Sequence, residues 1–370
     1  MRFKSFEQEW EYSTIGKCSI SLEYGMNAAA VKYDGKHKYI RITDIDEETS
    51  AFIPNPLSSP DGEFEQRYLV KENDILFART GASVGKSYLY NSNDGELYFA
   101  GFLIRARIKP EYNGPFIYYQ TKSKKYDRWV KLTSMRSGQP GINSQEYSGY
   151  PIAITGKVEQ DKIAYFFQML DNRISVQNKI ISDLKVLKKE LNGFLISRLI
   201  KGKESNCKIE DVIDYEQPTG YIVNSDKYIV DGKTPVLTAN KAFFLGYTNE
   251  KEGIYDKSDC IIFDDFTLDF KYVDFPFKVK SSAIKILTAK KSIELRYFYE
   301  YLLFLNLSTN EHKRHYISEI ATLPLYLPSI DEQRRVLNVL NAISSKITIE
   351  EKYKTTLQTQ KKHFLNAMFI

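Results

Sequence analysis

The sequence predicts an α+β fold in which two globular α/β units alternate with two long helices. Residues 150–197 align without a gap onto residues 323–370 at an offset of 173, so the chain contains an internal repeat. Both copies place apolar residues at alternating steps of three and four, which is the spacing of a coiled coil. The predicted organisation is a globular unit at 1–149, a helix at 150–201, a second globular unit at 202–322 and a helix at 323–370.

The two globular units are expected to share one frame. Short β-branched and aromatic runs at 39–43, 75–78, 87–90 and 102–108, and again at 260–263 and 283–287, indicate strands. Ile15 matches Ile209 at an offset of 194, and Leu76 matches Ile262 at 186. The offset falls in steps from 195 near residue 41 to 173 in the helices, so the second unit is shorter by 22 residues. This pattern indicates a duplicated fold whose loops have diverged.

Each long helix begins with the same motif. Pro151, Glu159 and Gln160 of the first copy fall on Pro324, Glu332 and Gln333 of the second. Ser329 stands three residues before Glu332 and predicts a capping box, whereas the first copy has Gly156 at that position. At 1.5 Å per residue, about 40 residues make a rod about 60 Å long.

The helices are predicted to pack through an apolar seam. Both seams become polar at matching places, at Gln177 and Glu350 and at Lys188 and Lys361, and we expect these residues to set the register. The expected interface comprises Ile163, Phe167, Leu170, Ile174, Ile181, Leu184, Leu340, Ile343, Ile347, Leu357 and Phe364.

Composition favours a soluble cytoplasmic protein. The 370 residues are 42% hydrophobic and 27% charged, which is typical of a folded globular chain. No apolar run approaches the ~18 residues that cross a bilayer, and the first ten residues lack the apolar segment of a secretory signal. Cys18, Cys207 and Cys260 never form a CxxC pair, which favours free thiols in a reducing compartment over a zinc site.

The motifs for catalysis or metal binding are incomplete. The segment 81–87, GASVGKS, has three residues between its glycines where a P-loop needs four, so we interpret it as a turn presenting Arg79, Thr80, Ser83 and Lys86. His312 and His315 lie three apart without a further ligand, which favours a surface or DNA-facing pair. No Asn-Pro-Pro-aromatic motif for adenine methylation is present. We expect no catalytic site and no metal site in this chain.

The basic residues are concentrated in two stretches. The net charge is only +5, but residues 105–136 contain nine basic and two acidic side chains interleaved with six aromatic ones. Residues 278–315 contain eight basic and three acidic side chains. Basic side chains among aromatic ones suit a surface that binds a phosphate backbone, although a solvated face has the same composition.

The alternation of two divergent segments with two near-identical helices resembles the specificity subunit of type I restriction–modification systems. The resemblance covers essentially the whole chain. It is carried by WEYSTIG at 10–16, DILFARTGASVGK at 74–86 and SGQPGIN at 137–143 in the first half, and by TPVLTANK at 234–241, LGYT at 245–248, CIIFDD at 260–265 and PSIDEQ at 328–333 in the second.

The resemblance implies that each globular unit is a target recognition domain reading one half of a bipartite site in double-stranded DNA. It also implies that the helices pack antiparallel as a spacer and hold two modification subunits, which carry S-adenosylmethionine and methylate adenine. Restriction subunits with an ATP-driven motor and a Mg-dependent nuclease would join them. This chain would then be non-catalytic and without a cofactor of its own.

The expected DNA contacts follow from residue type and loop position. They are Arg79, Thr80, Ser83, Lys86, Arg105, Lys131, Arg136, Gln139, Asn143, Thr238, Asn240, Lys241, Lys285 and Arg314. Three alternatives stay open at this stage: a methylation-only or other defence assembly, a coiled-coil scaffold that binds protein, and a P-loop enzyme.

Overall fold

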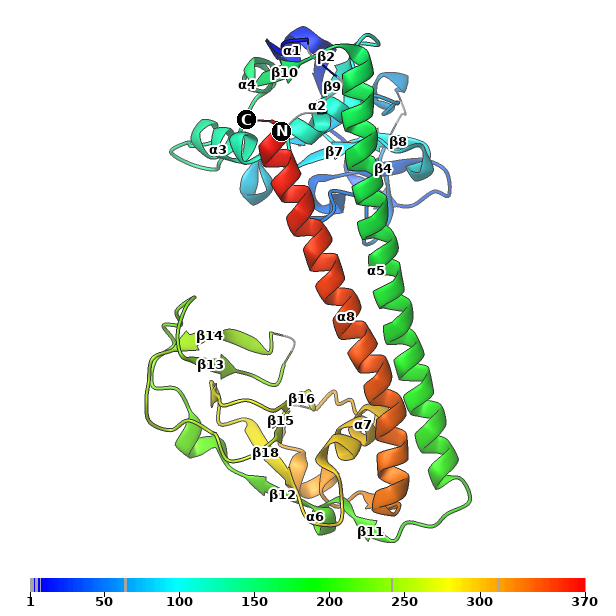
Figure 1. The fold of residues 1–370 in the computed structure, drawn as a ribbon, viewed down its shortest axis with the longest axis vertical. Helices are drawn as coiled ribbons and strands as arrows, with labels where there is room; N and C mark the ends of the chain where they lie inside the picture. The colour runs from blue at the N-terminus through cyan, green and yellow to red at the C-terminus, as the bar shows by residue number, and fades with distance from the viewer. Residues whose placement is uncertain are drawn as a thin grey trace. The chain divides into compact units, whose positions relative to one another are not determined.

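The computed structural model describes residues 3, 6, 8–62, 65–240, 242–311 and 313–369. They form two compact units, the first made of 1–178 with 352–370 and the second of 179–351. The unit boundaries fall inside the two long helices, α5 (Lys157–Ile200) and α8 (Ile330–Met368), so each helix contributes one half to each unit (Figure 1).

The first unit is built on a four-stranded sheet with the order β2-β9-β6-β7, in which all neighbours are antiparallel. A separate pair, β1 with β10, joins the start of the chain to the segment that precedes α5. The strands and short helices of this unit are β1 (Glu11–Thr14), α1 (Ile15–Cys18), β2 (Ser19–Tyr24), β3 (Ala30–Lys32), β4 (Lys38–Ile40), β5 (Ser58–Pro60), β6 (Asp74–Ala78), β7 (Ser87–Leu89), β8 (Leu97–Phe99), β9 (Leu103–Ile108), α2 (Gly114–Gln120), α3 (Lys124–Thr133), α4 (Ser144–Gly149) and β10 (Pro151–Ile154).

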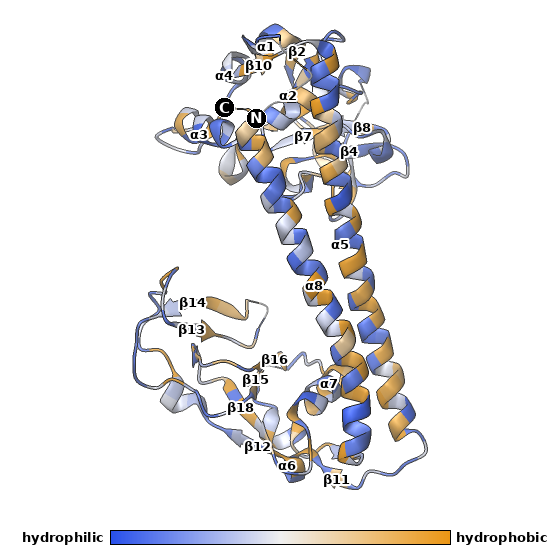
Figure 2. Cartoon of the chain, viewed as in Figure 1, coloured by the Kyte–Doolittle hydropathy of each residue, from blue (hydrophilic) through white to orange (hydrophobic). Residues whose placement is uncertain are grey.

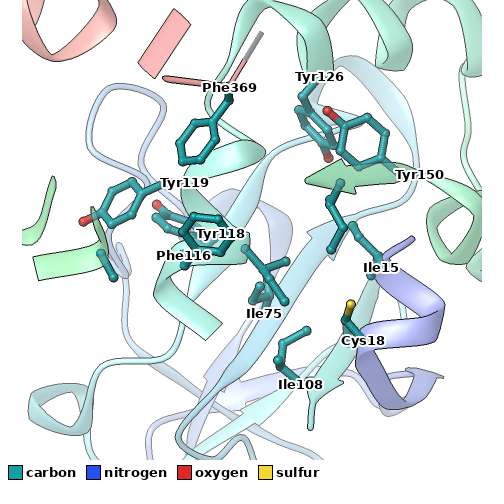
Figure 3. Close-up of a cluster of buried hydrophobic side chains, with 14 of the residues drawn as sticks. Ile15, Cys18, Ile75, Ile108, Phe116, Tyr118, Tyr119, Tyr126, Tyr150 and Phe369 are labelled. Atoms are coloured by element: carbon teal, nitrogen blue, oxygen red, sulfur yellow. The ribbon is translucent and has the colours of Figure 1, made fainter. Parts of the chain in front are cut away.

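The core of the first unit is rich in aromatic residues. Ile75 of β6 and Ile108 of β9 lie in one buried cluster with Phe116 and Tyr119 of α2 and with Phe369, which follows α8 (Figure 3). The first turns of α5 join the same cluster, as do Tyr126 of α3 and Tyr150 (Figure 3). Both long helices are therefore anchored in this globular core and are not free arms.

The second unit repeats the frame of the first. Its four-stranded sheet has the order β12-β18-β15-β16, again antiparallel throughout, and β11 pairs with β19 as β1 pairs with β10. The predicted duplication is confirmed by this equivalence of strand order. The elements are β11 (Cys207–Lys208), α6 (Ile209–Val212), β12 (Ile213–Glu216), β13 (Thr234–Leu237), β14 (Phe244–Thr248), β15 (Cys260–Asp264), β16 (Phe270–Val273), β17 (Lys278–Val279), β18 (Ile284–Ala289), α7 (Leu295–Leu305) and β19 (Pro324–Leu325).

Two details differ from the sequence-based expectations. The strand expected at 39–43 ends at Ile40, because Asp44 accepts a hydrogen bond from the backbone N–H of Arg41 at 2.8 Å and closes a 3₁₀ turn. In addition, α3 and α4 lie between α2 and β10 in the first unit, whereas the described residues of the matching part of the second unit form a single π-helical turn at Tyr316–Ile320. Much of the loop divergence is therefore concentrated after α2 and α7.

In each unit the segments of α5 and α8 run antiparallel. In the first unit, the rings of Phe166 and Phe364 lie 5.3 Å apart, and Asp171 pairs with Lys361. In the second unit, Lys185 Nζ lies 2.7 Å from a carboxylate oxygen of Glu351. Hydrophobic and hydrophilic residues alternate along both helices (Figure 2). Within the described part of the chain, no helix combines the length and apolarity needed to span a membrane.

The expected seam is buried over most of its length. Leu184, Ile343 and Phe364 are half-buried, and the buried members are Ile163, Phe167, Leu170, Ile174, Ile181, Leu340, Ile347 and Leu357. The two seam lysines each meet a carboxylate of their own unit. Lys188 donates to Glu300 of α7 at 2.8 Å, and Lys361 pairs with Asp171 of α5.

The glutamine of the helix-entry motif joins each long helix to its globular unit. Gln160 accepts a hydrogen bond from the backbone N–H of Asn113, just before α2, at 2.9 Å, and donates to a carbonyl of the turn before α5 at 2.7 Å. Gln333 repeats both bonds at 2.8 and 2.9 Å, with the N–H of Glu294, just before α7, as its donor. Both side chains are buried. The motif thus fixes the start of α5 against the start of α2, and the start of α8 against the start of α7.

Candidate nucleic-acid interface

Three loops of the first unit meet where β6 ends. The backbone N–H of Arg79 donates to Phe102 O at 3.1 Å, and Ile142 N–H donates to Arg79 O at 2.9 Å. Gly81 N–H donates to Pro140 O at 3.0 Å. We call the surface formed by residues 79–83, 101–102 and 135–141 the first platform. Backbone hydrogen bonds hold its loops on the sheet, so its side chains are presented from a fixed frame.

The glycine-rich segment after β6 is a turn, as the sequence indicated. Gly81 and Gly85 have φ angles of +75° and +89°, which favour glycine. A Cβ at Gly85 would lie 2.6 Å from a methyl group of Val130 on α3, so this glycine also permits close packing. The chain then enters strand β7, whereas a P-loop leads into a helix whose first N–H groups bind phosphate. The arrangement therefore does not form a phosphate cradle.

Arg79 holds a cationic group at the centre of the first platform. Its Cζ lies 4.9 Å from the ring centroid of Tyr24 and 5.8 Å from that of Phe102. Its Nε is buried without a hydrogen-bond partner, and no carboxylate in the described part of the chain forms an ion pair with it. Tyr24 OH accepts a hydrogen bond from Ser144 N–H at 3.2 Å, and hydrogen bonding to the side chain and backbone of Ser144, followed by the charge of Arg79, lowers the pKa of Tyr24.

The other predicted residues of this surface fall into two groups. Gln139 is exposed and lies near Gly81, while Thr80 and Ser83 are half-buried. Arg136 is exposed but donates to Glu146 at 2.5 Å and to two backbone carbonyls, so it fixes its own loop. Asn143 is exposed and caps α4, because its side-chain oxygen accepts from the N–H of Glu146 at 2.9 Å.

Helix α3 supplies the exposed cations beside the first platform. Lys124, Lys125, Arg128 and Lys131 are all exposed, whereas Tyr126 of the same helix is buried in the core. Such a cationic helix face suits contact with phosphates. Lys86, which was predicted to contribute in the same way, lies 2.7 Å from the carboxylate of Glu47, and this pairing reduces its free charge.

The prediction that Arg105 contacts DNA is wrong. Its side chain is 1% exposed, pairs with Glu23 and donates to the carbonyls of Arg67 and Leu69 at 2.8 and 3.1 Å. It lies on β9 in the middle of the sheet, where the charge is neutralised internally. A buried cation of this kind supports the fold and not a surface.

The second unit has the same backbone hydrogen bonds at the equivalent edge of its sheet, but different side chains. Asp265 N–H donates to Ala283 O at 2.9 Å, and His315 N–H donates to Asp265 O at 3.0 Å, repeating the two bonds made at Arg79. Lys285 was predicted to contact DNA, but it is 1% exposed, donates to Gln217 at 2.9 Å and lies 3.4 Å from Asp265. The prediction for Lys285 is therefore wrong, because its charge is neutralised inside the unit.

Most of the other predicted side chains in the second unit can also be located. His315 is buried and bonds to Glu319 at 2.8 Å, which raises its pKa, so the expectation of a surface histidine pair is wrong for this residue. Arg314 is exposed, with its Cζ 5.8 Å from the ring of Phe266. Asn240 is exposed, whereas Thr238 is buried and does not present its hydroxyl on the surface. Lys241 and His312 lie outside the described residues.

The aromatic partners of Arg79 and Arg314 are not among the site residues predicted from the sequence. Tyr24 and Phe102 flank Arg79, and Phe266 meets Arg314. The strand predicted at 102–108 includes Phe102, but this residue lies just before β9 and is 60% exposed. A large aromatic residue directly after Gly101 was the available signal, because a glycine beside a strand often marks a turn.

Two specificity subunits of type I restriction enzymes have sequences similar to this chain. A curated relative, the EcoR124I/EcoR124II type I restriction enzyme specificity subunit of Escherichia coli, is 37% identical over 187 residues, covering 46% of this chain and 44% of that protein. The chain thus spans less than half the length of that relative. A putative type I restriction enzyme MjaX specificity subunit of Methanocaldococcus jannaschii is 22% identical over 339 residues, covering 82% of this chain and 79% of that protein.

Solved structures show the same fold. The S subunit of a type I restriction–modification system from M. genitalium has a TM-score of 0.59 at 16% identity and covers 98% of this chain and 96% of its own. A chain from a type I restriction–modification assembly has a TM-score of 0.58 at 14% identity, with 97% and 98% covered. The family described as the type I restriction modification DNA specificity domain matches residues 8–186 and again 202–359. The chain therefore belongs to the family of type I restriction modification DNA specificity domains and contains two copies of that domain.

Proposed function

We propose that this chain is the DNA-recognition subunit of a type I restriction–modification complex, in which each unit reads one half of a bipartite site in double-stranded DNA. The observation that carries the proposal is the pair of equivalent edges. The same backbone bonds hold Arg79 in the first unit and the buried Asp265 in the second, so the two edges share a frame but do not present the same side chains. A shared frame with different side chains is what two readers of different sequences require.

The proposed partners follow from family membership and from the long helices. Two modification subunits would supply S-adenosylmethionine and methylate adenine, and restriction subunits would supply the ATP- and Mg-dependent motor and nuclease. This chain would be cytoplasmic, would bind no cofactor itself and would catalyse no step. Exposed apolar residues on α5, including Val158, Tyr165 and Val176, support attachment of other subunits along this helix, because large exposed patches commonly mark interfaces.

The decisive experiment maps methylation in DNA exposed to this chain together with its modification subunits. The expected product is a two-part motif with a fixed gap, and the isolated chain is expected to show no ATPase, nuclease or methyltransferase turnover. A DNA affinity that is independent of salt, together with no methylated motif, would overturn the proposal and favour a protein-binding scaffold. Methylation without cleavage after addition of the restriction subunits would identify a methylation-only assembly.

A phosphate contact offers a further test of the same proposal. Lys131→Ala on α3 is expected to weaken binding to all sequences alike and to reduce the slope of log K against log salt by about one. Lys179→Ala is the matched control, because this lysine is also exposed on a helix but lies on α5. An equal effect of both substitutions would show that α3 is not part of the DNA interface.

A further inference from the structure

We propose that Arg79 reads a guanine in the half-site bound by the first unit, and that Tyr24 and Phe102 are positioning residues that hold its guanidinium group. This inference rests on the proposed function and adds the base that is read. Arginine presents a planar fork of donors that matches the N7 and O6 acceptors of guanine in the major groove. The corresponding position of the second unit carries Asp265, which cannot make this contact.

The geometry keeps the cation of Arg79 in place and uncompensated. Two ring contacts, at 4.9 and 5.8 Å, restrict the guanidinium group, and the Nε atom has no hydrogen-bond partner. A side chain restricted before binding loses less conformational entropy when it meets a base. Among the described residues, Arg128 and Lys131 of α3 have no such ring contact, and they suit contacts with phosphates, which need charge more than direction.

The comparison of the two units argues against a general phosphate contact for Arg79. The backbone bonds that hold Arg79 are repeated at Asp265, so the two residues occupy equivalent places. A phosphate contact required by the common frame would need a cation at this place in both units, whereas the second unit has Asp265, whose side chain is 1% exposed and accepts hydrogen bonds from the N–H groups of His315 and Tyr316. In the second unit the nearby Lys285 is instead neutralised by Asp265 and bonded to Gln217. A difference at an equivalent place is expected of a residue that reads sequence.

The first step of the test assigns the half-sites. Methylation mapping gives both halves of the motif, and a photocrosslinker placed at the exposed Ala82 shows which half the first unit contacts. Each guanine of that half is then replaced by 7-deazaguanine, which lacks the N7 acceptor. Binding is measured with the complex of this chain and its modification subunits.

At one guanine, we expect wild-type binding to weaken on 7-deaza substitution while the Arg79→Ala variant loses nothing further. Arg79→Ala itself should lower selectivity for that base pair about 5- to 140-fold, the equivalent of one bidentate contact. Phe102→Ala should lower the same selectivity at unchanged thermal stability, because Phe102 is largely exposed, and Phe102→Tyr should restore it. A purely structural role of the ring would not change the preference for one base.

Three results would overturn the inference and leave the proposed function intact. The first is a first-unit half-site without guanine. The second is an Arg79→Ala variant that still responds to 7-deazaguanine. The third is an Arg79→Ala variant that binds all sequences more weakly and has a lower salt slope, which would make Arg79 a phosphate contact. The absence of any two-part motif would instead refute the proposed function.

Discussion

Lys122 lies where the first globular unit meets the long helices. Its ammonium group lies 4.6 Å from the ring centroid of Tyr118 and donates to Ser50 Oγ at 2.8 Å and to Ser87 O at 2.9 Å. Burial, followed by the positive charge of Lys361, lowers the pKa of Lys122 to about 7. The unfolded chain would keep an ordinary lysine pKa of about 10.4 and would bind more protons than the folded chain between these values.

This difference predicts that the free energy of unfolding rises with pH, because the proton that Lys122 loses on folding is released more easily at high pH than at low pH. Replacement of Lys122 by Met removes the titrating group, so the melting temperature of the variant relative to wild type should be highest near pH 7 and should fall as pH approaches 9. Lys125→Met, on the exposed face of α3, is the control and should show no such trend. Thermal melts at pH 7, 8 and 9 test the prediction, and parallel curves for Lys122→Met and wild type would contradict it.

Two of the predicted DNA contacts, Arg105 and Lys285, are buried. Each forms an ion pair or a hydrogen bond with a residue that is far away in the sequence. Arg105 pairs with Glu23, 82 residues earlier, and Lys285 donates to Gln217, 68 residues earlier. The alternation of side chains along a strand shows which face of the sheet each residue lies on. It does not show whether other parts of the protein cover that face. Exposed loop residues such as Gln139 could be found from sequence, because their position does not depend on such partners.

Arg105 and Arg79 should therefore behave oppositely on substitution. Arg105→Ala removes a cation from beside the fully buried Asp74 and leaves the carbonyls of Arg67 and Leu69 without their donor, so it is expected to destabilise the first unit by about 3–5 kcal/mol without changing base preference. Arg79→Ala loses its two ring contacts and should lower the free energy of unfolding by only about 1 kcal/mol. Urea denaturation gives both values. A destabilised Arg79 variant and an unaffected Arg105 variant would show that the assigned roles are reversed.

The elements predicted best are those with strong local signals. The heptad seam and the capping box at Ser329 were evident from sequence, and Ser329 indeed bonds with Glu332 in both directions, at 2.9 and 3.4 Å. The Glu332 carboxylate accepts hydrogen bonds from the backbone N–H and the hydroxyl of Ser329, and these two bonds lower the pKa of Glu332. The short helices α3 and α4 were not predicted as elements, because their basic and polar residues resemble a loop. Their position depends on packing, as in Tyr126 OH donating to Gly85 O at 2.9 Å.

The helix-entry glutamines make an element-scale prediction. Gln160→Leu and Gln333→Leu each remove the acceptor of a backbone N–H, that of the half-buried Asn113 or Glu294, so each should cost about 1–3 kcal/mol in its own unit. Both tryptophans of the chain, Trp10 and Trp129, lie in the first unit. Tryptophan fluorescence during denaturation should therefore respond to Gln160→Leu, whereas Gln333→Leu should change mainly the far-UV circular dichroism transition.

The matched control for these substitutions is Gln360→Leu, which changes an exposed glutamine on α8. It should leave both transitions unchanged. If Gln360→Leu is as destabilising as the two buried changes, the hydrogen bonds of the motif are not the cause. If Gln333→Leu shifts the fluorescence and circular dichroism transitions equally, the two units unfold as one cooperative body.

At the scale of the whole molecule, the chain passes between its two units only inside α5 and α8. The repeat in the sequence predicted two helices, but it assigned each helix as a segment separate from the globular units. Ile196, near the end of α5, is instead fully buried in the core of the second unit. The sequence could not show this, because an apolar heptad position looks the same whether it faces a partner helix or a globular core.

This arrangement specifies how to test whether the helices set the gap between half-sites. An insertion after Leu199 would lie one residue before the end of α5, in the last turn that packs in the second unit, so it would not lengthen the part of α5 that joins the two units. Four helix-forming residues should instead be added between Asn178 and Lys179 and, at the same time, between Glu351 and Lys352, because the helices run antiparallel in both units. Each helix then grows by about 6 Å with a net rotation of about 40°.

DNA advances about 3.4 Å per base pair, so the gap in the methylated motif should increase by one or two base pairs while both half-sites stay the same. A two-residue insertion at the same places rotates one reader by about 200° and should abolish recognition of the two-part site. The same four residues inserted into α8 alone are the control, and they should disrupt the pairing without producing a new gap. Methylation mapping with the modification subunits reads out every variant. An unchanged gap in an active double-insertion variant would mean that the length of α5 and α8 does not determine the spacing.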